Sequence, residues 1–370
     1  MPPISVLMKP ASGGCNMSCE YCFYCDEAKK RERAFYGMMT EQTLKNVIRK
    51  TMLYAEGQIT YVFQGGEPKL CGLDFYKQVI AYQKQYYREG LRVYNAIQTN
   101  GYALDDEWCR FFATYHFLVG VSVDGTKEIH DTYRHSKTGE PTFERIMQSI
   151  SLLEKHQVDY NILTVVTKLA AKHITDIYAY YKKKNWQYQQ YILCLEPLEE
   201  GYEKQEYALT PQEYGNFLIT LFELWYADWK LGRQPYIRQF ENYIGMVAGY
   251  QPESCDMRGK CSIQHVVEAD GSVYPCDFYV LDEYVLGNLN KQRMPEIAEA
   301  GRKSGFEERA LSVEESCKTC SYFKLCRGGC YRTRIEEGCS KSYYCEGYRM
   351  YFERCLGKMQ EMAEAIKSRK

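Results

Sequence analysis

Cysteine is the residue that most constrains what this chain can fold into. The 370 residues include 17 cysteines, most of them in two arrays with short spacings. A chain of this length can build a core without disulfide stapling, and the cysteine count is odd. Closely spaced thiols in such a chain are typical of metal or iron–sulfur ligands. The spacing therefore indicates that parts of this protein fold around metal centres.

The remaining composition is that of an ordinary soluble globular protein. Hydrophobic residues make up 45% of the chain and charged residues 26%. The formal net charge of −1 gives no electrostatic reason to expect binding to nucleic acid or to an anionic membrane. No apolar run approaches the ~18 residues of a membrane span, and Met1–Pro10 lacks the pattern of a signal peptide. We therefore expect a cytoplasmic protein that binds neither nucleic acid nor membrane.

Short apolar runs alternate with helical patterns in the first half of the chain. The runs predict strands at 4–9, 59–64, 91–98, 117–123, 159–166 and 188–193. The helical patterns lie near 41–56, 73–88, 105–115, 142–156 and 171–184, with Thr40 and Asp105 as N-caps of the first and third. Such alternation favours right-handed βαβ units and a parallel sheet. Six units are too few for a closed eight-stranded barrel, so we expect an α/β fold with an open, partial (β/α)6 barrel and functional residues at the strand C-termini.

The chain beyond residue 200 has a different character. Thr210-Pro211-Gln212-Glu213 combines an N-cap, a first-turn proline and a capping-box glutamate, which predicts a helix to about Lys230. From Cys255 onward cysteines dominate, which indicates a smaller, loop-rich module held by metal. We predict a barrel at 1–200, a helical connector at 201–250, a cysteine-rich module at 251–347 and a closing helix at 348–370. The charged run Lys29–Arg33 is interpreted as a solvated helix end or loop.

The first cysteine array directly follows the first predicted strand. Cys15, Cys19 and Cys22 form the pattern C-x3-C-x2-C. Three thiolates on one loop can hold three irons of a [4Fe–4S] cluster and leave the fourth iron open for an exogenous ligand. A structural zinc site would use four closed ligands, and Cys25 could supply the fourth. On spacing alone, this triad fits either an open cluster or zinc.

With Tyr21 as its aromatic residue, the triad resembles the signature of the radical S-adenosylmethionine (SAM) enzymes. Three further motifs fall at predicted strand ends, as the barrel rule requires. They are Gln64-Gly65-Gly66-Glu67-Pro68, Gln98-Thr99-Asn100-Gly101 and Ser122-Val123-Asp124-Gly125. In that family a GGEP motif at this place binds the amino group of the SAM methionine, and SAM chelates the open iron. The resemblance thus implies SAM as a cofactor.

The same resemblance implies a set of cofactor contacts. Arg134 suits the SAM carboxylate, because a guanidinium binds carboxylates bidentately, and its alternative is an ordinary surface arginine. Leu195 would offer adenine an apolar wall or a backbone group, and is otherwise a core residue. Tyr24 could contact SAM or the substrate, while Gln64 and Gln98 could hydrogen-bond an extended peptide. The expected set is Tyr21, Tyr24, Gln64, Gly65, Gly66, Glu67, Gln98, Ser122, Asp124, Arg134 and Leu195.

The second cysteine array is denser. Its pattern, C-x9-G-x4-C followed by C-x2-C-x5-C-x3-C and a last cysteine, resembles the SPASM extension of radical SAM enzymes. By family analogy, Cys255, Cys261, Cys276 and Cys330 would hold one auxiliary [4Fe–4S] cluster, and Cys317, Cys320, Cys326 and Cys345 a second, giving three clusters in all. Cys339 competes with Cys345 for the last place. Because cysteines would occupy every ligand position, the two auxiliary clusters are expected to carry electrons. The alternative is that these clusters only keep the surrounding loops folded.

The resemblance to the anaerobic sulfatase-maturating enzymes runs nearly end to end. It includes Lys9-Pro10-Ala11-Ser12, Cys22-Phe23-Tyr24, Phe63 to Pro68 and Asp270 to Tyr279. Those enzymes oxidise one Cys or Ser of a sulfatase, in a C/S-x-P/A-x-R type motif, to Cα-formylglycine. The resemblance implies a radical SAM oxidoreductase that acts on unfolded or nascent sulfatase polypeptide and receives electrons from an external low-potential donor. Cys and Ser are both open as the target.

The family's reaction places one carboxylate at its centre. A 5′-deoxyadenosyl radical from SAM would remove a hydrogen from the substrate Cβ, a base would take the thiol or hydroxyl proton, and a second electron would pass to an auxiliary cluster. Asp277 directly follows Cys276, and an Asp at this place is the family's proposed base. An unperturbed Asp has a pKa of ~3.9 and is a weak base, so burial would have to help it. The alternatives for Asp277 are a solvated loop carboxylate and a partner of a cluster sulfur.

Two other functions compete with this interpretation. Another SPASM peptide maturase would form thioether or carbon–carbon crosslinks in a small precursor peptide. Many such enzymes carry an extra N-terminal domain that grips a leader peptide, and the triad here begins at Cys15, which favours a leader-independent substrate. The third reading is a non-enzymatic zinc or iron–sulfur protein. Such a scaffold would have no need of the motifs around Gly66 and Ser122.

Overall fold

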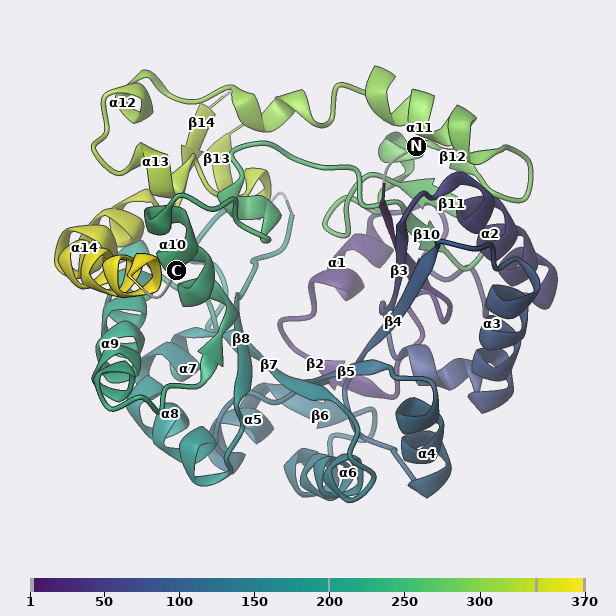
Figure 1. Ribbon diagram of the computed structural model, residues 1–370, viewed down its shortest axis with the longest axis horizontal. Coiled ribbons are helices and arrows are strands. Elements are labelled where there is room, and N and C mark those ends of the chain that lie inside the picture. Colours follow the sequence, from purple (N-terminus) through teal and green to yellow (C-terminus); the bar gives the residue numbers. More distant parts are fainter. Residues whose placement is uncertain (1–2, 199, 337–338, 369–370) are drawn as a thin grey trace. The chain divides into compact units, whose positions relative to one another are not determined.

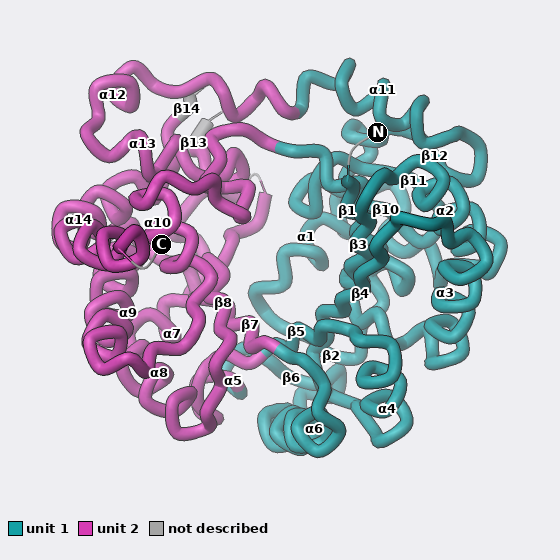
Figure 2. Tube along the Cα trace, viewed as in Figure 1, with its two compact units in different colours: residues 1–122, 131–160, 262–306 teal, residues 123–130, 161–261, 307–370 magenta. Residues whose placement is uncertain are grey.

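The computed structural model describes residues 3–198, 200–336 and 339–368 (Figure 1). The chain forms two compact units, each assembled from segments that are distant in sequence (Figure 2). Unit 1 comprises Met1–Ser122, Asp131–Tyr160 and Ser262–Phe306. Unit 2 comprises Val123–His130, Asn161–Cys261 and Glu307–Lys370.

A mostly parallel sheet forms the centre of unit 1. Its strands, in spatial order, are β12 (Gly287–Asn288), β11 (Ser272–Tyr274), β10 (Val266–Glu268), β1 (Ile4–Lys9), β3 (Gln58–Phe63), β4 (Arg92–Thr99) and β5 (Leu118–Ser122). The run from β10 to β5 is parallel, and β11 and β12 extend it with antiparallel pairs. Ile59, Tyr61 and Phe63 alternate along β3 and are fully buried, so this strand carries one core face.

The helices of unit 1 are α1 (Phe23–Lys29), α2 (Glu41–Tyr54), α3 (Leu73–Gln85), α4 (Asp106–Thr114), α6 (Phe143–Lys155) and α11 (Met294–Lys303). Helices α2 and α4 begin at the two N-caps that the sequence predicts. The Thr40 hydroxyl accepts the N–H of Thr43 at 3.2 Å, and Asp105 accepts the N–H of Trp108 at 2.9 Å. A short ribbon pairs β2 (Met17–Cys19) with β6 (Arg134–Ser136). Figure 1 shows α2, α3 and α4 along one side of β3 and β4.

Unit 2 combines three parallel strands with a helical layer. The strands are β7 (Tyr160–Val166), β8 (Tyr188–Leu193) and β9 (Tyr236–Ile237). The helices are α7 (Lys168–Lys172), α8 (Ile174–Lys183), α9 (Pro211–Lys230), α10 (Arg238–Ala248), α12 (Glu315–Lys318), α13 (Phe323–Cys326) and α14 (Cys345–Lys367), beside the hairpin of β13 (Arg334–Glu336) and β14 (Cys339–Ser342). Helix α5 (Lys127–Tyr133) runs from a segment of unit 2 into one of unit 1.

Aromatic side chains fill the space between α9, α10 and α14. The rings of Phe222 and Phe240 meet edge to face with centroids 5.2 Å apart, as do those of Tyr243 and Phe352. Tyr351 is fully buried in the same layer. Many tyrosines of this unit are buried in the same way and thus serve packing. None of the described helices combines the length and apolar character that crossing a membrane requires.

The six predicted strands and the α/β class are confirmed, with strand limits within two residues of the prediction. Helix α9 begins and ends as predicted, because the Thr210–Glu213 capping box fixes its start. The closing helix begins at Cys345, three residues earlier than predicted, and residue 370 lies outside the described residues. The helix expected at 171–184 is divided at His173 into α7 and α8.

Candidate active site

The loop between β1 and α1 carries the cysteine triad. The ribbon of β2 and β6 sets Cys19 opposite Arg134. The Arg134 guanidinium donates to the sulfur of Cys19 at 3.7 Å, and the Asn100 amide donates to that of Cys15, also at 3.7 Å. The N–H of Met17 points at the Cys15 sulfur, 3.4 Å away. Donors aimed at sulfur favour the thiolate, which is the form that binds metal.

The thiols of the triad differ in how easily they ionise. A hydrogen bond from Cys25 lowers the pKa of Cys22 to about 6, against the opposing effect of burial. The same contact raises the pKa of Cys25. Burial raises the pKa of Cys15, and the Met17 N–H partly offsets this effect. A loop with one ready thiolate and N–H donors to two other sulfurs fits the chemistry of an iron–sulfur ligand set.

The two glycines of the GGEP motif hold the triad loop against the end of β3. The N–H of Gly66 donates to Ser12 O at 3.0 Å, and that of Glu67 donates to Gly14 O at 2.7 Å. A Cβ on Gly66 would lie 2.0 Å from Gly14 O, and Gly65 adopts a φ of +129°. The close approach that only glycine allows is therefore made to the backbone of the triad loop.

Gly66→Ala is expected to dislodge the triad loop, because the new methyl group meets backbone that cannot rotate away. We expect a loss of about 1–3 kcal/mol or more in unfolding free energy and a lower iron content after reconstitution. Gly13→Ala is the matched control, since its Cβ would meet nothing closer than 3.4 Å. Denaturant titration and iron analysis measure both effects. Equal behaviour of the two variants would contradict this account of the loop.

Glu67 joins the ends of two strands. Its fully buried carboxylate accepts the Thr99 hydroxyl at 2.9 Å, the N–H of Asn100 at 2.9 Å and the N–H of Lys69 at 3.1 Å. Asn100 in turn donates to Asn16 of the triad loop at 2.7 Å. The hydrogen bonds of Glu67 thus tie the first and second strand-end motifs, at Gln64–Pro68 and Gln98–Gly101, to each other and, through Asn100, to the triad loop.

The other predicted cofactor contacts are divided between the two units. Tyr21 is buried, with the Arg134 guanidinium 5.4 Å from its ring centroid. In unit 2, Asp124 accepts the N–H of Val165 at 2.8 Å, and Leu195 follows the end of β8. The structure places Tyr21, Tyr24, Gln64, Gly65, Gly66, Glu67, Gln98, Ser122 and Arg134 in unit 1, and Asp124 and Leu195 in unit 2.

Asp277 lies in a buried polar contact, just beyond β11. Only 9% of the residue is exposed. One carboxylate oxygen lies 2.5 Å from the ammonium of Lys9, which is fully buried, and the other accepts a hydrogen bond from the Gln64 amide. The alternative of a solvated loop carboxylate is therefore wrong. Lys9 ends β1 and Gln64 follows β3, so two strand ends orient this carboxylate.

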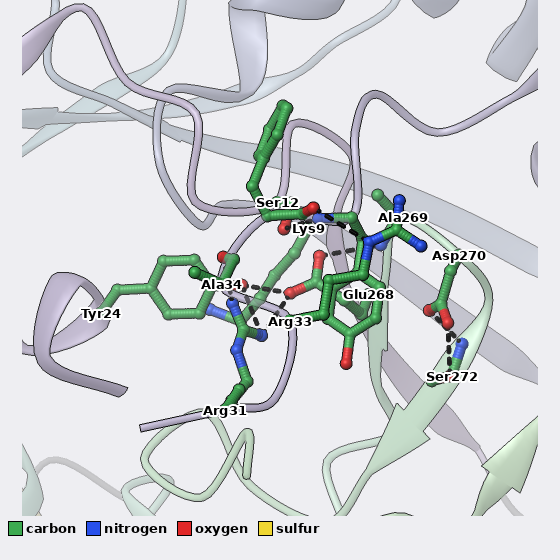
Figure 3. A network of polar contacts seen from close by, with 12 residues as sticks. Lys9, Ser12, Tyr24, Arg31, Arg33, Ala34, Glu268, Ala269, Asp270 and Ser272 are labelled. Atoms are coloured by element: carbon green, nitrogen blue, oxygen red, sulfur yellow. Dashed lines mark hydrogen bonds and ion pairs between the residues drawn. The ribbon is translucent and has the colours of Figure 1, made fainter. Parts of the chain in front are cut away.

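A second buried ion pair lies on the other side of Lys9. Lys9 and Glu268 are register partners on β1 and β10, and Glu268 pairs with Arg31 at 2.7 Å. The Tyr24 hydroxyl donates to the same carboxylate, and its ring lies under the Lys9 ammonium, 3.7 Å from the ring centroid (Figure 3). Burial, followed by the charge of Glu268, raises the pKa of Tyr24, so its hydroxyl stays a donor. The buried cations Lys9 and Arg31 thus balance the buried anions Asp277 and Glu268.

These contacts correct one interpretation and add residues that the sequence analysis missed. Arg31 belongs to the charged run Lys29–Arg33, which was expected to be solvated, yet Arg31 is only 5% exposed because Glu268 holds it. The sequence analysis gave Lys9 no role beyond the motif Lys9-Pro10-Ala11-Ser12, and it did not identify Glu268 as a site residue. The one signal in the sequence was a lysine at the end of a largely apolar strand.

The second cysteine array forms two groups. Cys317, Cys320, Cys326 and Cys345 together line one cavity of about 340 Å³ in unit 2. Burial, with the neighbouring charges of Cys345, Cys317 and Cys320, raises the pKa of Cys326 to about 12. A positively charged iron centre would relieve this crowding, so the four thiols fit a polynuclear cluster. The Cys339 side chain lies outside the described residues.

The other predicted auxiliary ligand set has four cysteines, and three of them lie near one another in unit 2. These three are Cys255, Cys261 and Cys330. Burial and then the charge of Cys255 raise the pKa of Cys261 to about 11. Burial raises the pKa of Cys330 to about 12, and Cys255 and Cys261 add to this effect. Cys276, the fourth predicted ligand, belongs to unit 1, where it directly precedes Asp277.

Comparison with known proteins gives family matches along most of the chain. The Radical SAM superfamily matches residues 10–180, and the SPASM iron–sulfur cluster-binding domain matches residues 255–321. A cysteine-type anaerobic sulfatase-maturating enzyme of Clostridium perfringens is 42% identical over 99% of this chain and 100% of its own length. A serine-type enzyme of Bacteroides thetaiotaomicron is 34% identical over 98% and 92%. The solved structure of native anSMEcpe with bound AdoMet and Cp18Cys peptide superposes with a TM-score of 0.94, at 40% identity over 99% and 100% of the two chains.

The parallel strands, the cysteine triad and the second array define a radical SAM enzyme with a SPASM domain. Within that class, the chain belongs to the anaerobic sulfatase-maturating enzymes. The resemblance of the sequence to this family is thereby confirmed, as is the assignment as an enzyme. The two matched domains indicate iron–sulfur clusters and SAM as cofactors.

Proposed function

We propose that this protein oxidises a cysteine side chain within a short sulfatase motif to Cα-formylglycine. The observation that carries the proposal is Asp277, which is buried, oriented by Lys9 and Gln64, and adjacent to a predicted cluster ligand. Cysteine is the preferred target because the cysteine-type relatives are 40–42% identical to this chain and the serine-type relatives 30–34%. The substrate is unfolded or nascent sulfatase polypeptide, which places the reaction in the cytoplasm.

Eleven cysteines hold three [4Fe–4S] clusters in this proposal. The first cluster has the triad as ligands and leaves one iron open to SAM. The N–H donors of Asn100 and Arg134 to sulfur support this assignment. The two auxiliary clusters have the ligand sets Cys255, Cys261, Cys276, Cys330 and Cys317, Cys320, Cys326, Cys345.

Reductive cleavage of SAM bound at the triad, with an electron from an external low-potential donor, supplies a 5′-deoxyadenosyl radical. The residues of this chain then govern what happens to the substrate. The substrate Cβ loses one hydrogen atom, its thiol proton passes to Asp277, and a second electron leaves toward the auxiliary ligand set that includes Cys276. The resulting carbon–sulfur double bond reacts with water to give the aldehyde and hydrogen sulfide. The side chain loses one hydrogen atom, one proton and one electron in total. This sum equals two electrons and two protons, as the oxidation requires.

Lys9 and Gln64 prepare Asp277 for this proton transfer. The Lys9 ammonium lies at one carboxylate oxygen and the Gln64 amide at the other. A base that is already held in one orientation reduces the entropic cost of reaching the geometry for proton transfer from the thiol. Lys9 and Gln64 are therefore positioning residues.

Peptides with the two target residues test the proposal. The enzyme, reconstituted anaerobically with iron and sulfide, is incubated with SAM, a reductant and a Cys-x-Pro-x-Arg or Ser-x-Pro-x-Arg peptide. Mass spectrometry with a hydrazide trap is expected to show aldehyde, faster on the cysteine peptide. Release of 5′-deoxyadenosine without aldehyde on either peptide would refute formylglycine formation and favour a crosslinking peptide maturase.

A further inference from the structure

We propose that a basic, apolar-floored groove of unit 2 docks an acidic one-electron carrier protein beside the cavity of Cys317, Cys320, Cys326 and Cys345. We call this groove the α10–α13 groove, since both helices contribute to its wall. The inference rests on the proposed function, because it takes those four thiols as cluster ligands. It adds the surface at which electrons are exchanged with a partner and the charge of that partner.

The α10–α13 groove has the size and floor of a protein contact. It is a cavity of about 830 Å³ with Met246 and Val247 of α10, Phe323 and Leu325 of α13 and Leu356 of α14 among its lining residues. Leu311 at its edge is 58% exposed. Exposed large apolar side chains beside a concave surface are typical of interaction sites. A small contact of this kind suits the transient encounters of redox partners.

The charge of the α10–α13 groove selects the partner. Arg258, Lys324 and Arg327 are among its lining residues, and none of the described residues that line it is acidic. Side-chain N–H groups of Arg258 and Arg327 donate to the backbone carbonyls of Pro252 and Lys324, each at 3.1 Å. These bonds fix the guanidinium stems at the rim. A cationic rim around an apolar floor favours an acidic partner and disfavours the arginine-containing motif of a sulfatase.

The α10–α13 groove and the four-thiol cavity share a wall. Ser321 and Phe323 line both, and the four residues of α13 contribute Phe323, Lys324 and Leu325 to the groove and Cys326 to the cavity. The cavity is basic as well, with Lys341 and Arg349 in its lining. Because of this shared wall, a carrier protein seated in the groove would bring its redox group close to the four thiols.

The electron exchange at this surface needs no bond to form or break. During turnover the group held by the four thiols gives up one electron, which originates from the substrate, and an oxidised carrier is reduced by it. A reduced carrier passes one electron across the same surface in the opposite direction. The co-reactant is an acidic flavin or iron–sulfur carrier of low potential. Its negative surface pairs with Arg258, Lys324 and Arg327, which speeds the encounter at low ionic strength.

Charge reversal with Lys324→Glu and Arg327→Glu tests the docking surface. A reduced acidic flavodoxin serves as the probe, with two readouts on the reconstituted enzyme: its dissociation constant from calorimetry, and the rate of cluster bleaching after stopped-flow mixing. We expect the double variant to lose about tenfold or more in both, because the encounter is electrostatically steered. In the unaltered enzyme, affinity for flavodoxin should fall as salt rises from low to physiological concentration.

The control pair is Lys172→Glu and Lys183→Glu, two exposed lysines of unit 2 that do not line the groove. This pair should bind flavodoxin like the unaltered enzyme. Aldehyde formation driven by dithionite, which needs no docking, should be equal in all three proteins. Its absence in all three would refute the proposed function, whereas its presence leaves docking as the only variable. Flavodoxin binding that ignores salt and charge reversal, or self-association of the chain that the reversal abolishes, would overturn the docking proposal.

Discussion

Asp277→Asn is expected to leave SAM cleavage intact and to remove most of the aldehyde product. The amide keeps the shape of the carboxylate but cannot take the thiol proton. A positioned base contributes about 10²–10⁴-fold to such a step, so aldehyde formation should fall by about that factor. The measurement is the ratio of aldehyde to 5′-deoxyadenosine in one reaction, since this ratio separates the proton transfer from the radical step.

The control for Asp277 is Asp282→Asn. Asp282 is an exposed carboxylate five residues further on in the same unit, and it accepts the N–H of Glu32 at 2.7 Å. Its variant should give the normal ratio. A normal ratio from Asp277→Asn as well would remove Asp277 from the mechanism and leave it as a structural partner of Lys9.

Lys9→Met should be the most destabilising single change in the described polar network. The methionine keeps much of the length of the side chain but leaves the buried Asp277 carboxylate without its cation. Removing one partner of a buried ion pair lowers the free energy of unfolding by about 3–5 kcal/mol. We therefore expect a lower urea midpoint for the reconstituted variant under anaerobic conditions. Aldehyde formation should fall together with stability, because Asp277 loses its orientation.

A double-mutant cycle isolates the Lys9–Asp277 pair from general damage. The variant that carries both Lys9→Met and Asp277→Asn has no unpaired charge at this place, so its loss of stability should be clearly smaller than the sum of the two single losses. Lys29→Met changes an exposed lysine and should shift stability by no more than about 0.5 kcal/mol. Strict additivity of Lys9→Met and Asp277→Asn would show that the two groups do not interact.

Local signals in the sequence predicted much of the fold. Thr40, Asp105 and the Thr210–Glu213 box cap their helices within three residues, and this short range is why they could be recognised. The strands were recognisable because Ile59, Tyr61 and Phe63 and their counterparts are apolar with the period of a strand. The same logic placed the cysteine triad and the strand-end motifs together.

The buried polar network could not be predicted in the same way, because its partners are far apart in sequence. Arg31 and Glu268 are separated by 237 residues. They meet only because β10, a three-residue strand in a loop-rich stretch, joins the unit 1 sheet beside β1. A strand that short leaves no periodic signal. Likewise, the backbone contact that requires Gly66 depends on how the triad loop folds back, which the residue pattern alone does not encode.

A deuterium-labelled peptide tests the central claim most directly. The Cys-x-Pro-x-Arg peptide carries two deuterium atoms on the cysteine Cβ and is turned over anaerobically with SAM and dithionite. We predict one deuterium in the 5′-deoxyadenosine and one remaining on the aldehyde carbon, with the two products formed together. Unlabelled 5′-deoxyadenosine alongside aldehyde, or labelled 5′-deoxyadenosine with a crosslinked peptide in place of the aldehyde, would contradict the oxidation of Cβ to formylglycine by this enzyme.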